Sequence, residues 1–109
     1  MTPAQPLADE LAVKPPEVLL VDDDEVNLLL TAIALRERGF AVTESSGGEH
    51  ALQLLASWAP DIIVLDAMMP GLDGFEVARR LKADANTAHI PIIFMTGLTE
   101  TEYLVAALE

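Results

Sequence analysis

The sequence predicts an α/β fold, a doubly wound parallel sheet with helices on both faces. Short apolar runs alternate with helix-like segments from about residue 17 onward, in the order βαβαβαβα. Two of these runs, residues 18–21 and 62–65, are apolar throughout and end directly in Asp22 and Asp66. Apolar runs bounded by turns are typical of strands buried on both faces, as in parallel sheets. Right-handed crossovers then distribute the helices over both faces.

Composition limits the classes of protein to which the chain can belong. At 109 residues with 51% hydrophobic residues, it is predicted to form one globular domain. Eighteen acidic and six basic residues give a net charge of −12, so we expect no direct nucleic-acid binding by this segment and no membrane association. The absence of cysteine excludes disulfides and fits a cytoplasmic location. The apolar stretches stop short of the roughly 20 residues that span a bilayer, and the N-terminus lacks the pattern of a signal peptide.

The N-terminal residues differ from the rest in composition. Four of the seven prolines lie within the first sixteen residues. We therefore expect a flexible Pro-rich tail over 1–16 and a single domain over 17–109.

The first half of the domain has two predicted helices. After the first strand, apolar residues recur at helical spacing until Gly39 ends the helix: Val26, Leu29, Leu30, Ile33 and Ala34. A short strand is expected over 40–43. Ser46 and Glu49 then match a capping box, which predicts a helix with one apolar stripe in the core, made of Ala51, Leu54, Leu55 and Trp58.

The second half repeats the alternation. Residues 69–74 have turn chemistry, with Asp73 as the expected N-cap of a third helix that carries Phe75, Ala78 and Leu81 inward. A loop is expected over 84–89, and Pro91 precedes a strand over 92–95 that leads to Thr96. A second capping box at 99–102 predicts a final helix that continues to residue 109.

The acidic residues at the strand ends form the candidate site. In an open α/β sheet, ligands bind outside the carboxyl ends of the strands, so Asp22, Asp23 and Asp66 should meet there. Crowded carboxylates raise one another's pKa values, and a divalent cation relieves that repulsion. The pattern therefore indicates a metal site suited to phosphate chemistry.

Four segments together resemble the receiver domain of bacterial two-component response regulators, such as the chemotaxis receivers. They are Val21-Asp22-Asp23-Asp24, the run from Leu65 to Gly71, Leu72-Asp73-Gly74 and Met95-Thr96-Gly97. The resemblance runs from about residue 18 to residue 109. It implies a flavodoxin-like fold with strand order 2-1-3-4 in this chain, without the fifth strand and helix.

The resemblance also implies a function. Asp66 would be the phosphoacceptor, which takes a phosphoryl group from a sensor histidine kinase or a phosphotransfer protein and forms an aspartyl-phosphate. Asp22 and Asp23, with Asp66 and the backbone carbonyl of Met68, would hold Mg²⁺, an ion that prefers oxygen ligands. Thr96 would hydrogen-bond the phosphoryl group and act as a switch. An output domain or effector protein would receive the signal, and the chain would not be a turnover enzyme.

Simpler roles are expected for other residues of the same motifs. Asp24 should cap the helix that follows it. His50 and His89 are expected to be solvent-exposed, and Met68 and Met69 to serve packing and turn geometry.

The chain departs from the receiver pattern at its C-terminal end. The family's fifth strand carries a lysine and an aromatic switch residue, whereas no lysine follows Lys82. The strand over 92–95 should then lie at an apolar sheet edge, which favours a homodimer or strand exchange. The alternative function is a receiver-like protein-interaction module that does not switch. A metal-dependent phosphatase is disfavoured, because haloacid-dehalogenase-type phosphatases have a second Asp two residues after the nucleophile, where this chain has Met68. A nucleotide-binding domain is disfavoured as well, because phosphate-binding loops have Gly, Ser and Thr after the first strand, where this chain has three acids.

Overall fold

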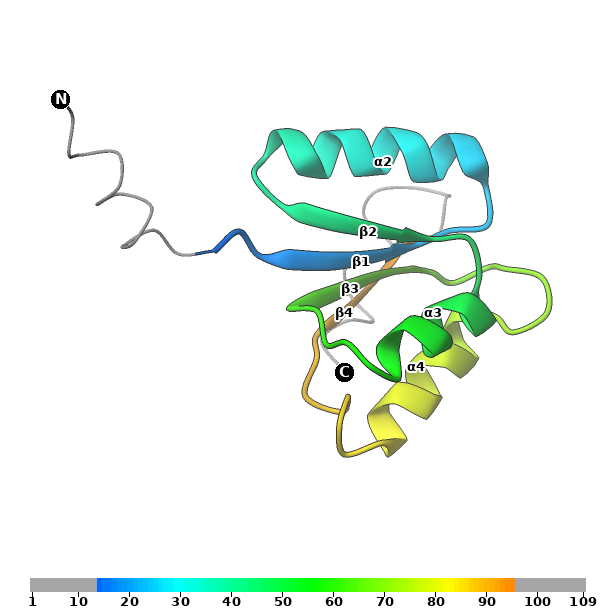
Figure 1. The fold of residues 1–109 in the computed structure, drawn as a ribbon. Coiled ribbons are helices and arrows are strands. Elements are labelled where there is room, and N and C mark those ends of the chain that lie inside the picture. The colour runs from blue at the N-terminus through cyan, green and yellow to red at the C-terminus, as the bar shows by residue number, and fades with distance from the viewer. Residues whose placement is uncertain (1–13, 96–109) are drawn as a thin grey trace, which may run out of the picture.

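A computed structural model describes residues 14–95, which form a four-stranded parallel sheet (Figure 1). The strands lie in the order β2-β1-β3-β4. Their bounds are β1 (Glu17–Val21), β2 (Ala41–Ser45), β3 (Ile62–Asp66) and β4 (Ile92–Met95). The predicted fold class and the strand order 2-1-3-4 are confirmed, with β2 starting one residue and ending two residues later than expected. Residues 1–13 of the tail predicted over 1–16, and the predicted final helix, lie outside the described residues.

Helices cover both faces of the sheet, as Figure 1 shows. Helix α2 (Glu25–Glu37) lies on one face, and α3 (Gly48–Leu55) and α4 (Gly74–Ala83) lie side by side on the other. None of these described helices is long and apolar enough to cross a membrane. The larger part of the core lies between the sheet and the α3 and α4 pair.

Strand β1 is the centre of the fold. Its residues Val18, Leu19, Leu20 and Val21 are at most 1% exposed, because β1 has a strand on each side and helices above and below. Full burial of such a side chain contributes about 1.5–3 kcal/mol. Leu19 and Val21 pack towards α3 and α4, whereas Leu20 packs towards α2. This double burial explains the continuous apolar run in the sequence.

Two of the predicted helix caps are confirmed. The Asp24 carboxylate accepts hydrogen bonds from the N–H groups of Val26 (2.9 Å) and Asn27 (3.1 Å) at the start of α2. The Asp73 carboxylate accepts one from the Glu76 N–H (2.9 Å) at the start of α4. Each cap satisfies backbone donors that the first turn of a helix leaves unpaired.

The capping box predicted for α3 is wrong. Gly47 is the N-cap of α3, and no side chain caps this helix. Strand β2 continues to Ser45, so Ser46 and Gly47 are needed to turn the chain before the helix begins. Ser46 therefore lies one residue too early to cap α3.

The apolar residues that predicted α2 are not its core face. Leu28 and Ala32 are the buried residues, whereas Val26, Leu29, Leu30 and Ile33 are between 43% and 63% exposed and Ala34 is exposed. Apolar residues surround most of this helix, so spacing alone could not identify the buried stripe.

The prediction that Phe75 points into the core is also wrong. Val77 and Leu81 form the buried stripe of α4, and Phe75 precedes Val77 by more than half a helical turn. Its side chain is 50% exposed, and its ring lies 4.9 Å from that of Phe94 on β4. Phe75 therefore covers the edge strand rather than the centre of the core.

Candidate functional site

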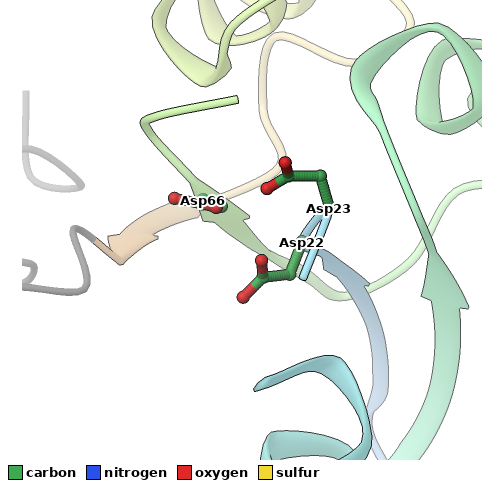
Figure 2. A group of neighbouring side chains, drawn as sticks. All are labelled: Asp22, Asp23 and Asp66. Atoms are coloured by element: carbon green, nitrogen blue, oxygen red, sulfur yellow. The ribbon is translucent and has the colours of Figure 1, made fainter. Parts of the chain in front are cut away.

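Three carboxylates gather at the carboxyl ends of β1 and β3 (Figure 2). Each of Asp22, Asp23 and Asp66 has a carboxylate oxygen that lies within 4.8 Å of one from each of the other two. The register accounts for this, because Val21 at the end of β1 pairs with Leu65 on β3. The prediction that the three acids meet at one edge of the sheet is therefore confirmed.

Asp22 is the most buried of the three acids. Only 4% of it is exposed. Its N–H donates to the Ser45 carbonyl on β2 (3.0 Å), and its Oδ1 accepts a hydrogen bond from the Asp24 N–H (3.0 Å). These two bonds fix the turn between β1 and α2 and hold the carboxylate in place.

The site has no cationic side chain to balance these acids among residues 14–95. The ion pairs of this part of the chain join Arg36 to Glu44, and Arg79 and Arg80 to Glu76, and none of them involves an acid of the cluster. A buried carboxylate without a partner is costly. The acid cluster is therefore left with an uncompensated negative charge.

Asp66 shows the electrostatic consequence. Burial, together with the nearby Asp22 and Asp23, raises the pKa of Asp66 from 3.8 to about 6. A hydrogen bond from the Met68 N–H (3.1 Å) opposes this rise, because it favours the ionised form. The surroundings of Asp66 thus disfavour its ionised form.

The donor set fits a hard divalent cation. It consists of carboxylate oxygens alone, from one buried, one exposed and one half-buried residue. Mg²⁺ prefers such oxygen ligands and keeps several of its waters, so a few carboxylates suffice. A cation at this place would also remove the repulsion that raises the pKa of Asp66.

The loop between β3 and α4 is held tightly against the site. The Gly74 N–H donates to the Ala67 carbonyl (3.2 Å), and the Ala67 N–H donates to the Met95 carbonyl (2.9 Å). A Cβ atom on Gly74 would lie 2.2 Å from the Asp66 carbonyl oxygen and 2.8 Å from the Ala67 Cα. Gly74 therefore permits the close approach that places the start of α4 behind Asp66.

Met68 and Met69 have different surroundings. Met69 is buried in the main core, which agrees with its predicted packing role, whereas the Met68 side chain is 70% exposed and only its backbone contacts Asp66. Thr96, the predicted switch residue, lies outside the described residues.

The histidines are exposed as predicted, but His50 has a partner that sequence reasoning missed. Its Nδ1 lies 2.9 Å from the hydroxyl oxygen of Ser45, a residue that is 1% exposed. The Ser45 hydroxyl also donates to the Gly47 carbonyl (3.0 Å). No spacing rule pairs a strand end with the first turns of the next helix, so the sequence carried no signal for this contact.

Comparison with known proteins agrees with this geometry. The family model of the response regulator receiver domain matches residues 18–109. The response regulator PleD of Caulobacter vibrioides is 46% identical over 81 residues, which cover 74% of this chain and 18% of PleD. The transcriptional regulatory protein AfsQ1 of Streptomyces coelicolor is 39% identical over 94 residues, or 86% of this chain and 40% of that protein. The chain thus spans less than half the length of these curated relatives.

Solved structures agree as well. The receiver domain of the sensor histidine kinase PA1611 from Pseudomonas aeruginosa, which has a magnesium ion coordinated in its active-site cleft, superposes with a TM-score of 0.73 at 32% identity. The match covers 85% of this chain and 79% of that one. The N-terminal domain of a response regulator receiver protein from Methanoculleus marisnigri gives the same TM-score and identity over 80% of this chain and 72% of the other. This chain therefore belongs to the family of response regulator receiver domains.

Proposed function

We propose that the chain is a phosphoacceptor receiver and that Asp66 accepts a phosphoryl group from a histidine kinase or a phosphotransfer protein. The observation that supports this most is the meeting of Asp22, Asp23 and Asp66 at the end of the sheet, with Asp66 half-buried. In the reaction, an Asp66 oxygen forms the new P–O bond while the P–N bond to the donor histidine breaks, and that nitrogen keeps the electron pair.

The other acids have a supporting role in this proposal. Asp22 and Asp23, with Asp66 and the backbone carbonyl of Met68, would hold Mg²⁺, which supplies positive charge for the incoming phosphoryl oxygens. Asp22 is suited to this role because its backbone and one carboxylate oxygen are already fixed by hydrogen bonds. The Thr96 hydroxyl would donate a hydrogen bond to the phosphoryl group.

The protonation state of Asp66 also fits a nucleophile. With a pKa of about 6, Asp66 is mostly ionised near pH 7, and a bound cation would favour ionisation further. The carboxylate is thus charged when it is needed, but the site must be neutralised before an anionic phosphoryl group can approach. The chain itself is modified in this reaction, so we assign it no enzymatic turnover.

The partners follow from the same proposal. The phosphorylated receiver would act on an output domain or an effector protein, and we expect the exchange to occur in the cytoplasm. Strand β4 lies at one edge of the sheet formed by residues 14–95, and an apolar edge strand favours pairing with another strand. A homodimer or strand exchange through β4 is therefore part of the proposal.

One observation favours the alternative, a receiver-like module that binds partners without switching. The sequence has two lysines: Lys14 precedes β1, and Lys82 lies in the last turn of α4, before β4. Lys82 donates to the Ala88 and Ile90 carbonyls (3.2 and 3.1 Å) in the loop before β4, at the opposite end of the strands from the acids. Neither lysine is therefore placed to pair with a phosphoryl group on Asp66.

Mass spectrometry of the intact chain separates the two functions. The chain is incubated with Mg²⁺ and a small acyl-phosphate donor, and a phosphoryl adduct is expected in the parent chain but not in Asp66→Asn. Glu37→Gln, which removes an exposed acid on α2, is the matched control and should retain the adduct. If the parent chain binds Mg²⁺ but gains no phosphoryl group, the interaction module becomes the better account.

A further inference from the structure

A pocket with a mixed polar and apolar lining is found at the end of the sheet where the strands begin, opposite to the acid cluster. Its volume is about 290 Å³, and it is lined by residues 55–59 and by Asp84, Asn86 and Thr87. Leu55 is the last residue of α3, residues 56–59 lie between α3 and β3, and Asp84, Asn86 and Thr87 lie between α4 and β4. Because α3 and α4 run side by side with their C-terminal ends on the same side (Figure 1), the two loops meet below the sheet. This pocket is therefore separate from the proposed phosphoacceptor site.

The aromatic wall of the pocket is Trp58. This residue was predicted to be core, but it is half-buried: it packs against the main core and lines the pocket as well. Its Nε1 donates a hydrogen bond to the Glu17 Oε1 (3.0 Å), which fixes the indole ring. A fixed aromatic ring is a good surface for a flat group, and its π face attracts cations.

The part of the lining that comes from the loop between α4 and β4 carries a negative charge. Asp84 is the C-cap of α4, and one of its carboxylate oxygens, Oδ1, accepts a hydrogen bond from the Asn86 N–H (2.9 Å). The other oxygen, Oδ2, has no hydrogen-bond partner among residues 14–95. The neighbouring cation, Lys82, donates to backbone carbonyls of the same loop instead of pairing with Asp84.

The C-terminus of α3 adds to this negative potential, because its last turn has no basic residue, whereas the last turn of α4 carries Arg80 and Lys82. Helix α3 ends at Leu55 and α4 at Ala83, so the C-termini of both helices lie at the pocket. A helix C-terminus carries a partial negative charge that favours cations within its last turn. An aromatic wall, a carboxylate and the C-terminus of α3 thus share one cavity.

From this combination we propose that the pocket binds a guanidinium group. Guanidinium is planar, stacks on aromatic rings and pairs with carboxylates, which matches the indole and Asp84 walls. The volume is just below the range of roughly 300–1,000 Å³ that is typical of small-molecule sites, so it suits a single side-chain-sized group. The group belongs either to an arginine of a polypeptide or to a free guanidine compound.

Trp58 is the only tryptophan of the chain, so its fluorescence reports directly on the pocket. The whole chain is titrated with three probes: arginine capped at both ends, methylguanidine and capped citrulline, the neutral analogue of arginine. The two guanidinium probes are expected to give a saturable change that citrulline does not give. Tighter binding of capped arginine than of methylguanidine assigns the pocket to a polypeptide side chain, and the reverse order assigns it to a free compound.

Variants test whether the carboxylate contributes. Asp84→Asn keeps an oxygen for the Asn86 N–H but loses the charge, so it should weaken guanidinium binding about tenfold, the loss expected for one charge-assisted hydrogen bond. Glu37→Gln removes the same charge on the opposite face of the sheet and should bind like the parent chain. The proposal is overturned if no probe saturates, if citrulline matches arginine, or if Asp84→Asn binds as well as Glu37→Gln.

Discussion

Carboxylate oxygens of Asp22 and Asp66 lie within 4.8 Å of each other at the ends of two neighbouring strands. Asp22 is almost fully buried, and Asp66 has its pKa raised to about 6 by burial and by Asp22 and Asp23. The fold therefore maintains a concentration of negative charge that costs stability in the absence of a cation. This cost supports the proposal that the cluster binds a divalent ion.

Magnesium should stabilise the chain through this cluster. A ligand that binds only the folded state adds about 2.7 kcal/mol to the free energy of unfolding when its free concentration is about 100 times its Kd. We expect Mg²⁺ to raise the melting temperature of the parent chain and of Glu37→Gln, but not of Asp22→Asn, in differential scanning fluorimetry. An equal rise in Asp22→Asn would place the cation elsewhere.

The raised pKa of Asp66 predicts a specific pH dependence. Between pH 3.8 and about 6, the folded chain keeps a proton on Asp66 that the unfolded chain releases. The contribution of Asp66 to the free energy of unfolding therefore falls as the pH rises through this window, and it stays unfavourable above it. Without divalent cations, Asp66→Asn should gain stability relative to the parent chain from pH about 4 to pH about 7.

Urea denaturation of both chains at each pH measures this difference. Acidic residues remote from the cluster are the same in both chains, so their effects cancel in the comparison. A difference in the free energy of unfolding that does not change with pH would show that Asp66 has an ordinary pKa.

Gly74 should be sensitive to the smallest substitution. In Gly74→Ala, the new Cβ would meet the Asp66 carbonyl oxygen and the Ala67 Cα at distances that backbone atoms do not allow. Displacement of this loop should cost about 1–3 kcal/mol of stability, as overpacking typically does, and should weaken Mg²⁺ binding because Asp66 moves.

Gly47→Ala is the matched control for this substitution. Gly47 has an extended backbone, and no atom lies within 4 Å of its added Cβ. Urea denaturation and a Mg²⁺ titration of both variants should separate them clearly. Equal effects in the two variants would mean that the contact at Gly74 is not what constrains the loop.

The buried face of α2 can be tested with two leucines. Leu28 is 9% exposed, so Leu28→Ala should lower the free energy of unfolding by about 2–4 kcal/mol. Leu30 is 59% exposed, and Leu30→Ala should change it by less than about 0.5 kcal/mol. Thermal or urea denaturation checks both values, and a larger loss at Leu30 would indicate that a second surface covers this helix.

The sequence was sufficient to predict the strands and the acid cluster. Strand β1 is covered on both faces, so its residues had to be apolar without interruption, and that run was visible directly. In a parallel sheet, the carboxyl ends of β1 and β3 lie at the same end of the sheet, so the sequence predicts that Asp22 and Asp66 meet there. The strand order itself came from the resemblance to receivers.

Features that depend on tertiary packing could not be predicted in this way. The contact between Gly74 and the end of β3, the outward position of Phe75 and the pocket beside Trp58 all depend on how α3 and α4 lie against the sheet. Helix α2 is apolar on nearly every side, so its periodicity did not identify Leu28 and Ala32 as the buried pair. Local sequence patterns predict where the helices and strands lie, whereas tertiary packing determines which side of each helix is buried.

We expect Asp66 itself to become phosphorylated. After incubation with Mg²⁺ and an acyl-phosphate donor, borohydride reduces an aspartyl-phosphate to homoserine, and peptide mass spectrometry then identifies the residue that was modified. We predict homoserine at position 66 and no conversion at positions 22 and 23. An unmodified residue 66, or conversion at another acid of the cluster, would contradict this prediction.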